Sequence, residues 1–212
     1  MTMFLIFFVV CLLSAGISAT ETDDGWISLF NGRTPDGWEA VENPASVSVR
    51  DGMITGDGPR AHLFYVGPAH DHDFKNFIFR ADVKTATGTN SGIFFHTELE
   101  NSPSPRKGYE VQINNTMPRE KVKTGSLYRV KELYETEVKD GVWFTMEITV
   151  IDKRIVVKVD GNTVMDFTEP PDHTPPRSHP QRYLSSGTFA LQFHDPKSKV
   201  FFKNIVVKPL PD

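Results

Sequence analysis

The sequence predicts an all-β protein, built as a sandwich or jelly roll of two stacked antiparallel sheets. Three segments carry this prediction, because each alternates apolar and polar residues with the period of two that marks a half-buried strand. They are residues 92–98, 108–114 and 188–195. Further strand signals recur between turn residues along the chain, and no helical period is sustained beyond a short turn near residues 131–137.

The chain begins with a segment that we expect to lie outside the fold. Residues 4–13 form an apolar run, followed by small residues and a suitable cleavage position at Ala19. We interpret residues 1–19 as a secretory signal peptide, with an uncleaved anchor as the alternative. Cleavage would remove Cys11 and leave a protein without disulfides, exported to the periplasm or beyond, with no membrane attachment.

The remaining residues, 20–212, are expected to form one domain. Turn signals such as Asp51-Gly52 and Asp160-Gly161 separate the expected strands, and two Pro-rich loops interrupt them at residues 100–107 and 169–181. Besides the three segments above, the expected strands are residues 46–50, 53–55, 77–84, 145–151, 154–160, 163–168 and 200–208.

Composition agrees with a single globular domain. The chain has 212 residues, a net charge of -4 and sixteen Phe, enough for an aromatic core of sandwich size. Basic residues are scattered and do not alternate with aromatics, so nothing indicates a nucleic-acid partner.

The polar side of the three alternating segments indicates a ligand. It carries amides, imidazoles and a few carboxylates, which both donate and accept hydrogen bonds. An ordinary solvated face would carry Lys, Thr, Ser and Glu. This pattern suits a neutral, hydroxyl-rich ligand such as a sugar.

Five motifs in order resemble those of the 3-keto-disaccharide hydrolase family, a match that covers roughly residues 25–210. The motifs are residues 25–32 (GWISLFNG) with Gly37-Trp38, 90–96 (NSGIFFH), 108–113 (GYEVQI), 124–128 (TGSLY), and 187–194 (GTFALQFH) with 202–205 (FKNI). The resemblance implies a concanavalin A-like jelly roll with the ligand on its concave sheet, and activity on glycosides oxidised at C3 of a glucose unit. Three residues depart from the family pattern: His96 replaces Arg, Asn114 replaces Asp, and Phe144 replaces Asn.

Two mechanisms can be compared with these residues. A standard glycosidase needs two carboxylates at the scissile bond, yet the alternating positions of one strand are Glu110, Gln112 and Asn114. A 3-keto-glucoside needs only one base for the C2 proton, donors for the enolate and a proton source for the leaving group. We predict elimination followed by addition of water, with Glu110 or His194 as base and His96 as acid.

The predicted substrate-binding residues surround these three. Arg60, His62 and Tyr65 are expected at one rim, where they would stack on or hydrogen-bond a sugar. Trp26 and Trp38 are expected to pack the N-terminal strand onto the core instead. The other predicted substrate-binding residues are Asn90, Gln112, Asn114, Tyr128, Gln192 and Asp195.

No cofactor or metal is predicted. Residues 70–73 (HDHD) have metal-binding side chains, but neighbours on an extended chain point apart, so at most alternate residues could share an ion. The alternatives to an enzyme are a non-catalytic carbohydrate-binding module on the same fold, or a structural surface domain. The expected partner is a 3-keto-glucoside, and the sequence leaves the oligomeric state open.

Overall fold

The computed structural model describes residues 24–102 and 104–212. The predicted signal peptide and Cys11 lie outside the described residues. The described part contains thirteen strands, two short 3-10 turns (Pro44–Ser46 and Ala69–His72) and no α-helix. None of it forms a helix long and apolar enough to cross a membrane. The all-β prediction is therefore confirmed.

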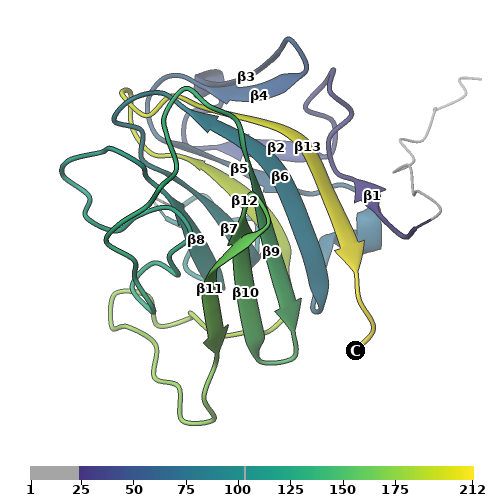
Figure 1. Cartoon of the computed structure of the whole chain (residues 1–212). Helices are drawn as coiled ribbons and strands as arrows, with labels where there is room; N and C mark the ends of the chain where they lie inside the picture. Colours follow the sequence, from purple (N-terminus) through teal and green to yellow (C-terminus); the bar gives the residue numbers. More distant parts are fainter. Residues whose placement is uncertain (1–23, 103) are drawn as a thin grey trace, which may run out of the picture.

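The strands form two antiparallel sheets that stack face to face (Figure 1). One has five strands in the order β2-β5-β12-β7-β8. The other follows the path β11-β10-β9-β6-β13-β4-β3, with β1 added beside β13. The strands are β1 Ile27–Ser28, β2 Trp38–Val41, β3 Val47–Arg50, β4 Met53–Gly56, β5 Ala61–Tyr65, β6 Phe77–Thr85, β7 Ser91–Thr97, β8 Tyr109–Ile113, β9 Phe144–Ile151, β10 Arg154–Val159, β11 Asn162–Thr168, β12 Thr188–Phe193 and β13 Val200–Pro209.

A phenylalanine-rich core fills the space between the sheets. Every second residue of β6 is buried, beginning with Phe77 and Phe79, and both pack against Phe189 of the opposite sheet with ring centroids 4.9 and 4.7 Å apart. Trp38 is buried too, and its Nε1 donates to the Leu29 carbonyl at 2.6 Å. Trp38 therefore anchors the N-terminal segment to the core, as the sequence predicts.

The two sheets differ in burial. In the eight-stranded sheet, strands such as β6 and β9 alternate between buried and partly exposed residues. In the five-stranded sheet, β5, β7, β8 and β12 are buried on both sides. Residues outside the core therefore cover the polar side of this sheet. Two long loops contribute to this cover, residues 114–143 after β8 and residues 169–187 between β11 and β12, and they meet beside β8 (Figure 1).

The segment after β8 differs from the prediction. The expected helical turn at residues 131–137 is wrong, because the chain there is irregular and has no helical turn. The Lys123 amide donates to the Leu133 carbonyl, and the Leu133 amide donates to Ser126 Oγ. These bonds hold Leu133 against the core, which a helical turn would not achieve.

Both sheets have covered edges. Residues 126–128 pair with β8, since the Tyr128 amide donates to the Glu110 carbonyl at 3.0 Å. On the other sheet, Lys131 Nζ donates to the Asp166 carbonyl of edge strand β11 at 2.9 Å.

Candidate active site

The candidate site lies on the outer face, which we define as the side of the five-stranded sheet turned away from the core. Strand register places the predicted residues there in rows. One row crosses the sheet through His62, Gln192, Gly92 and Gln112. The next row contains Phe64, Ala190, Phe94 and Glu110, of which the first three form a small apolar cluster. The outer face thus combines an apolar floor with amides, imidazoles and a carboxylate.

Glu110 leans over Gly92 of the neighbouring strand. A Cβ at Gly92 would lie 2.8 Å from Glu110 Oε1, closer than real Cβ contacts, so only glycine leaves room for this carboxylate. The Glu110 side chain is 5% exposed. Burial raises the pKa of the Glu110 carboxyl, and a neighbouring Arg182 opposes that rise.

Arg182 is the main site residue that sequence reasoning missed. Its buried guanidinium lies 3.3 Å from Glu110 Oε2 and donates to the Tyr128 carbonyl at 2.9 Å. Arg182 directly follows the Pro-rich loop 169–181, 72 residues away from Glu110 in sequence, and no local motif marks it. The loop therefore brings a cation onto the outer face that the strand pattern could not reveal.

His194 lies two residues beyond Gln192 and therefore on the same side of the chain. Its Nδ1 is 3.0 Å from Asp195 Oδ2, and its side chain is 41% exposed. Partial burial alone would raise the pKa of Asp195, but hydrogen bonds from His194, the Lys197 amide and Ser198 hold that pKa below its usual range. An ionised Asp195 favours the tautomer with the proton on Nδ1, which leaves Nε2 as a base.

His62 forms a second imidazole–carboxylate pair. Its Nδ1 is 2.5 Å from Glu42 Oε2, and Arg60 Nε donates to the other Glu42 oxygen at 3.1 Å. Burial lowers the pKa of His62, so the ring is neutral at pH 7, although Glu42 opposes this shift. Among the described residues, nothing hydrogen-bonds the buried Nε2. Glu42 is a further residue of this site that the strand pattern did not indicate.

The predicted amides lie together. Gln112 Nε2 donates to Asn90 Oδ1 at 2.8 Å, which fixes the Gln112 carboxamide. The Gln192 carboxamide makes no hydrogen bond within the described part of the chain, so its N–H groups can serve a ligand. His194 is close enough to affect the pKa values of both His62 and Glu110. These three side chains therefore belong to one polar region of the outer face.

Three predicted residues lie elsewhere. His96 sits at a bulge between β7 and β12 with φ at 54°, and its ring packs against Phe77 of the core. Both of its ring nitrogens are bonded, to the Lys75 carbonyl and the Ser185 amide, and burial lowers its pKa to about 4. The bulge turns the ring away from the outer face, which corrects the expectation that His96 lies there.

Tyr65 and Asn114 also lie away from the outer face. Tyr65 is turned into the core, where its ring meets Trp38 at 5.3 Å, because its position on β5 has the parity of the inner side. Asn114 holds the loop after β8: its Nδ2 donates to the carbonyls of Glu120 and Val122, each at 2.8 Å. Through these bonds Asn114 stabilises the conformation of the loop.

The His-Asp-His-Asp segment forms an unusual turn. His70, Asp71 and His72 all have φ near 50°, a left-handed conformation that is strained for residues with a Cβ. The His70 ring stacks on Phe74 at 5.7 Å, so it does not converge with its neighbours on a common point. Among the described residues, no group of three His, Cys, Asp or Glu could hold a metal ion.

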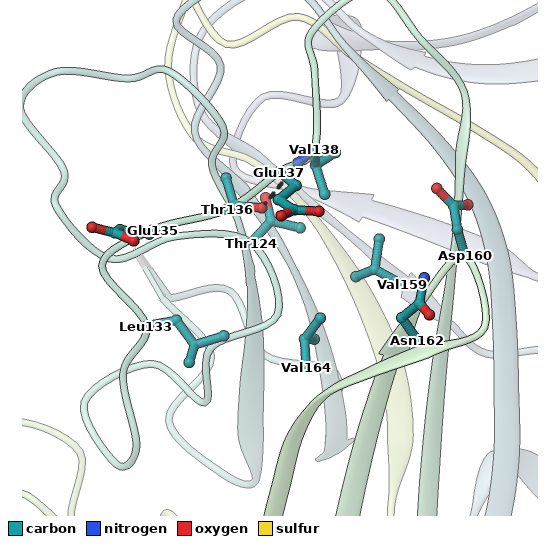
Figure 2. A pocket seen from close by; sticks show the side chains of 10 residues that line it. All are labelled: Thr124, Leu133, Glu135, Thr136, Glu137, Val138, Val159, Asp160, Asn162 and Val164. Carbon is teal, nitrogen blue, oxygen red and sulfur yellow. Dashed lines mark hydrogen bonds between the residues drawn. The ribbon is translucent and has the colours of Figure 1, made fainter.

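A cavity of about 550 Å³ lies away from the outer face (Figure 2). It opens between residues 133–138 and the turn that joins β10 to β11, with Leu133 and Val164 on one side and Asp160 and Asn162 on another. None of the predicted site residues lines it.

Comparison with known proteins agrees with the fold and the motifs. The family model of the 3-keto-alpha-glucoside-1,2-lyase-like domain matches residues 25–208, so the chain belongs to this family. A 3-keto-disaccharide hydrolase of Bacteroides thetaiotaomicron is 32% identical over 97 residues, which cover 39% of this chain and 33% of that protein. The match thus spans about a third of the length of that relative.

Solved structures are similar in fold. A "putative glycosyl hydrolase" from Parabacteroides distasonis aligns with a TM-score of 0.74 and 24% identity, over 91% of this chain and 99% of that one. A carbohydrate binding module from Bacillus subtilis aligns with a TM-score of 0.58 and 12% identity, over 81% of this chain and 95% of that one. At these identities the likeness shows the jelly-roll fold alone.

Proposed function

We propose that this member of the 3-keto-alpha-glucoside-1,2-lyase-like family cleaves 3-keto-glucosides, including 3-keto-disaccharides, by elimination followed by addition of water. The family and the Bacteroides relative support a hydrolase-type enzyme that acts on oxidised sugars. The observation that carries the proposal is the composition of the outer face, where one buried carboxylate, Glu110, lies within electrostatic reach of His194. On β8 its alternate neighbour is Gln112, so the strand lacks a carboxylate pair for double displacement.

The ketone makes this chemistry accessible to a single base. The C3 carbonyl acidifies the hydrogen on C2, and a base takes that proton while charge moves to the C3 oxygen as an enolate. The enolate expels the oxygen on C1, which leaves with a proton, and a C1–C2 double bond forms. Water then adds at C1 and a proton returns to C2, so the net reaction is hydrolysis.

His194 is the base we favour. Asp195 accepts a hydrogen bond from its Nδ1–H, which leaves Nε2 free to take a proton from carbon. Its ring is partly exposed, whereas Glu110 is buried against Arg182, so a sugar can reach His194 without disrupting an ion pair. A positioned base of this kind contributes about 10²–10⁴-fold to the rate.

The remaining polar groups suit the sugar and its developing charge. The free Gln192 carboxamide and the Arg182 guanidinium can donate to an enolate oxygen or to hydroxyls. Glu110 can accept from a hydroxyl or return a proton to the leaving oxygen. Donors fixed by packing need little reorganisation during the reaction, which is the condition for effective electrostatic stabilisation.

A carbohydrate-binding module is the second candidate, because one of the similar folds belongs to such a module. Binding modules commonly present flat exposed aromatics to a sugar. Here the aromatics of the outer face, Phe64 and Phe94, are buried in a small cluster. The polar character of the face therefore favours the enzyme.

One experiment separates these candidates. The purified protein would be incubated in D₂O with methyl 3-keto-α-glucoside and with its unoxidised parent, followed by proton NMR. Cleavage of the keto compound alone, with deuterium entering C2, is the expected result. Saturable line broadening of the sugars without turnover would instead identify a binding module, and cleavage of the unoxidised parent would contradict the elimination route.

We also propose that the protein is exported after removal of residues 1–19. N-terminal sequencing of the protein recovered from a secreting host tests this, with Thr20 expected as the first residue. An intact Met1 would contradict it.

A further inference from the structure

A small cavity of about 420 Å³ lies where the two long loops meet. It is lined by Arg129, Val130, Glu132 and Tyr134 from the loop after β8, and by Pro176 from the Pro-rich loop. Pockets that hold small ligands begin at about 300 Å³, so this space can take one sugar ring. We propose that it binds the group attached to C1 of the oxidised glucose, preferably a second sugar. This inference rests on the proposed function and assigns the residues that would hold the second sugar.

Tyr128 lies between the cavity and the outer face. The Tyr128 amide pairs with the Glu110 carbonyl, so Tyr128 stands at the sheet edge next to the reactive row. Two guanidinium groups lie over its ring: Cζ of Arg182 is 5.8 Å from the ring centroid, and Cζ of Arg129 is 5.3 Å from it. Arg182 contacts Glu110, whereas Arg129 lines the cavity. A ligand that extends from Glu110 past the Tyr128 ring would therefore meet Arg129 and the cavity that it lines.

The lining residues have the chemistry that recognises a pyranose. Tyr134 is 63% exposed, the largest exposed fraction among the exposed large hydrophobic side chains of the described residues. Its hydroxyl donates to Glu132 Oε2 at 2.9 Å. An exposed aromatic ring offers a stacking surface to sugar C–H groups, and Arg129 with Glu132 supplies a donor and an acceptor for hydroxyls.

A hydrogen-bonded turn places the Arg129 side chain beside the cavity. Arg129 has φ at 61°, a conformation that costs energy for a residue with a Cβ. Its amide donates to Glu132 Oε1 at 3.1 Å, which fixes the turn. Here the strained turn aims the guanidinium at both Tyr128 and the cavity.

The test compares a long and a short substrate. The Tyr134→Ala and Arg129→Gln variants would be assayed on 3-keto-maltose, which has a second sugar, and on methyl 3-keto-α-glucoside, which has none. We expect kcat/KM for 3-keto-maltose to fall by about tenfold in each variant, the effect of losing one good contact. Values for the methyl glycoside should not change. Phe201→Ala is the matched control, because Phe201 is a partly exposed aromatic on the eight-stranded sheet.

The outcomes distinguish this inference from the proposed function. An equal loss on both substrates, or no loss on either, overturns the second-sugar site while leaving the cleavage reaction in place. If the wild-type protein cleaves neither substrate, the proposed function fails, and saturation-transfer NMR with unoxidised maltose becomes the test. Signals from maltose that disappear in Tyr134→Ala would still support a sugar site, whereas signals that are missing or unchanged would overturn it.

Discussion

The outer sides of the two sheets use polar residues in opposite ways. On the eight-stranded sheet the charges pair with one another at the surface: Arg80 and Lys158 both contact Glu147, at 2.6 and 3.0 Å. Partial burial alone would raise the pKa of Glu147, but hydrogen bonds from its two partners keep that pKa below its usual range. On the five-stranded sheet the polar groups are buried, and His62 Nε2 is buried without a hydrogen-bond partner among the described residues.

This difference separates a solvated face from a binding face. Exposed ion pairs that satisfy each other contribute little free energy and have nothing left to offer a ligand. A buried polar group without a partner costs free energy, so natural proteins retain one where a ligand or water completes its hydrogen bonds. The comparison therefore points to the five-stranded sheet as the functional side and predicts that changes on the two sheets have different consequences.

The largest effect should come from His194→Ala. Loss of the proposed base should lower kcat/KM on methyl 3-keto-α-glucoside by about 10²–10⁴-fold and slow deuterium entry at C2 equally. Steady-state kinetics and NMR exchange measure this. His70→Ala is the matched control, because that ring stacks on Phe74 away from the outer face. Exchange at C2 that proceeds at the wild-type rate would remove His194 from the role of base.

Arg182→Ala should have the next largest effect, on stability. It leaves the buried Glu110 carboxylate without its partner, and breaking a buried ion pair costs about 3–5 kcal/mol. Urea unfolding followed by intrinsic fluorescence measures the free energy of unfolding. In Glu110→Gln/Arg182→Met both charges are gone, so much of the loss should be recovered. A double variant no more stable than Arg182→Ala would argue against an uncompensated charge as the cause.

His96 should make the five-stranded sheet sensitive to pH. Its folded pKa of about 4 lies below the unfolded value of 6.5, so the unfolded state binds its proton first as the pH falls. Stability from the neutral ring is fully present above pH 6.5 and decreases as the pH falls toward 4. Between pH 7 and pH 5 the wild-type protein should lose about 2 kcal/mol more than His96→Gln does. Equal losses in the two proteins, measured by urea unfolding at each pH, would contradict this.

The smallest effect should come from Arg80→Ala on the eight-stranded sheet. The Arg80 side chain is 43% exposed, and Glu147 keeps Lys158 as a partner, so the cost should stay below about 1 kcal/mol. It should shrink further in high salt, which screens exposed pairs. The same urea unfolding at low and high ionic strength checks both points. A cost as large as that of Arg182→Ala would remove the distinction between the two sheets.

Strand alternation was sufficient to predict most of the fold and the centre of the site. It located β7, β8 and β12 to within one or two residues at each end and assigned Glu110, Gln112 and Gln192 to one side. The same period misplaced His96, because a bulge changes the parity of the chain and depends on contacts with a neighbouring strand. Arg182 and Glu42 reach the outer face from irregular segments, where no periodic pattern relates sequence to direction.

The hydrogen bond from Lys131 to edge strand β11 has a consequence for behaviour in concentrated solution. An open edge strand offers its amides and carbonyls to other chains, and this is how folded β-proteins begin to aggregate. Lys131 occupies one such acceptor, the Asp166 carbonyl, and places a positive charge along the edge. The loop that carries part of the proposed sugar site therefore also protects the sheet from neighbouring molecules, so shortening it to alter specificity would risk insolubility.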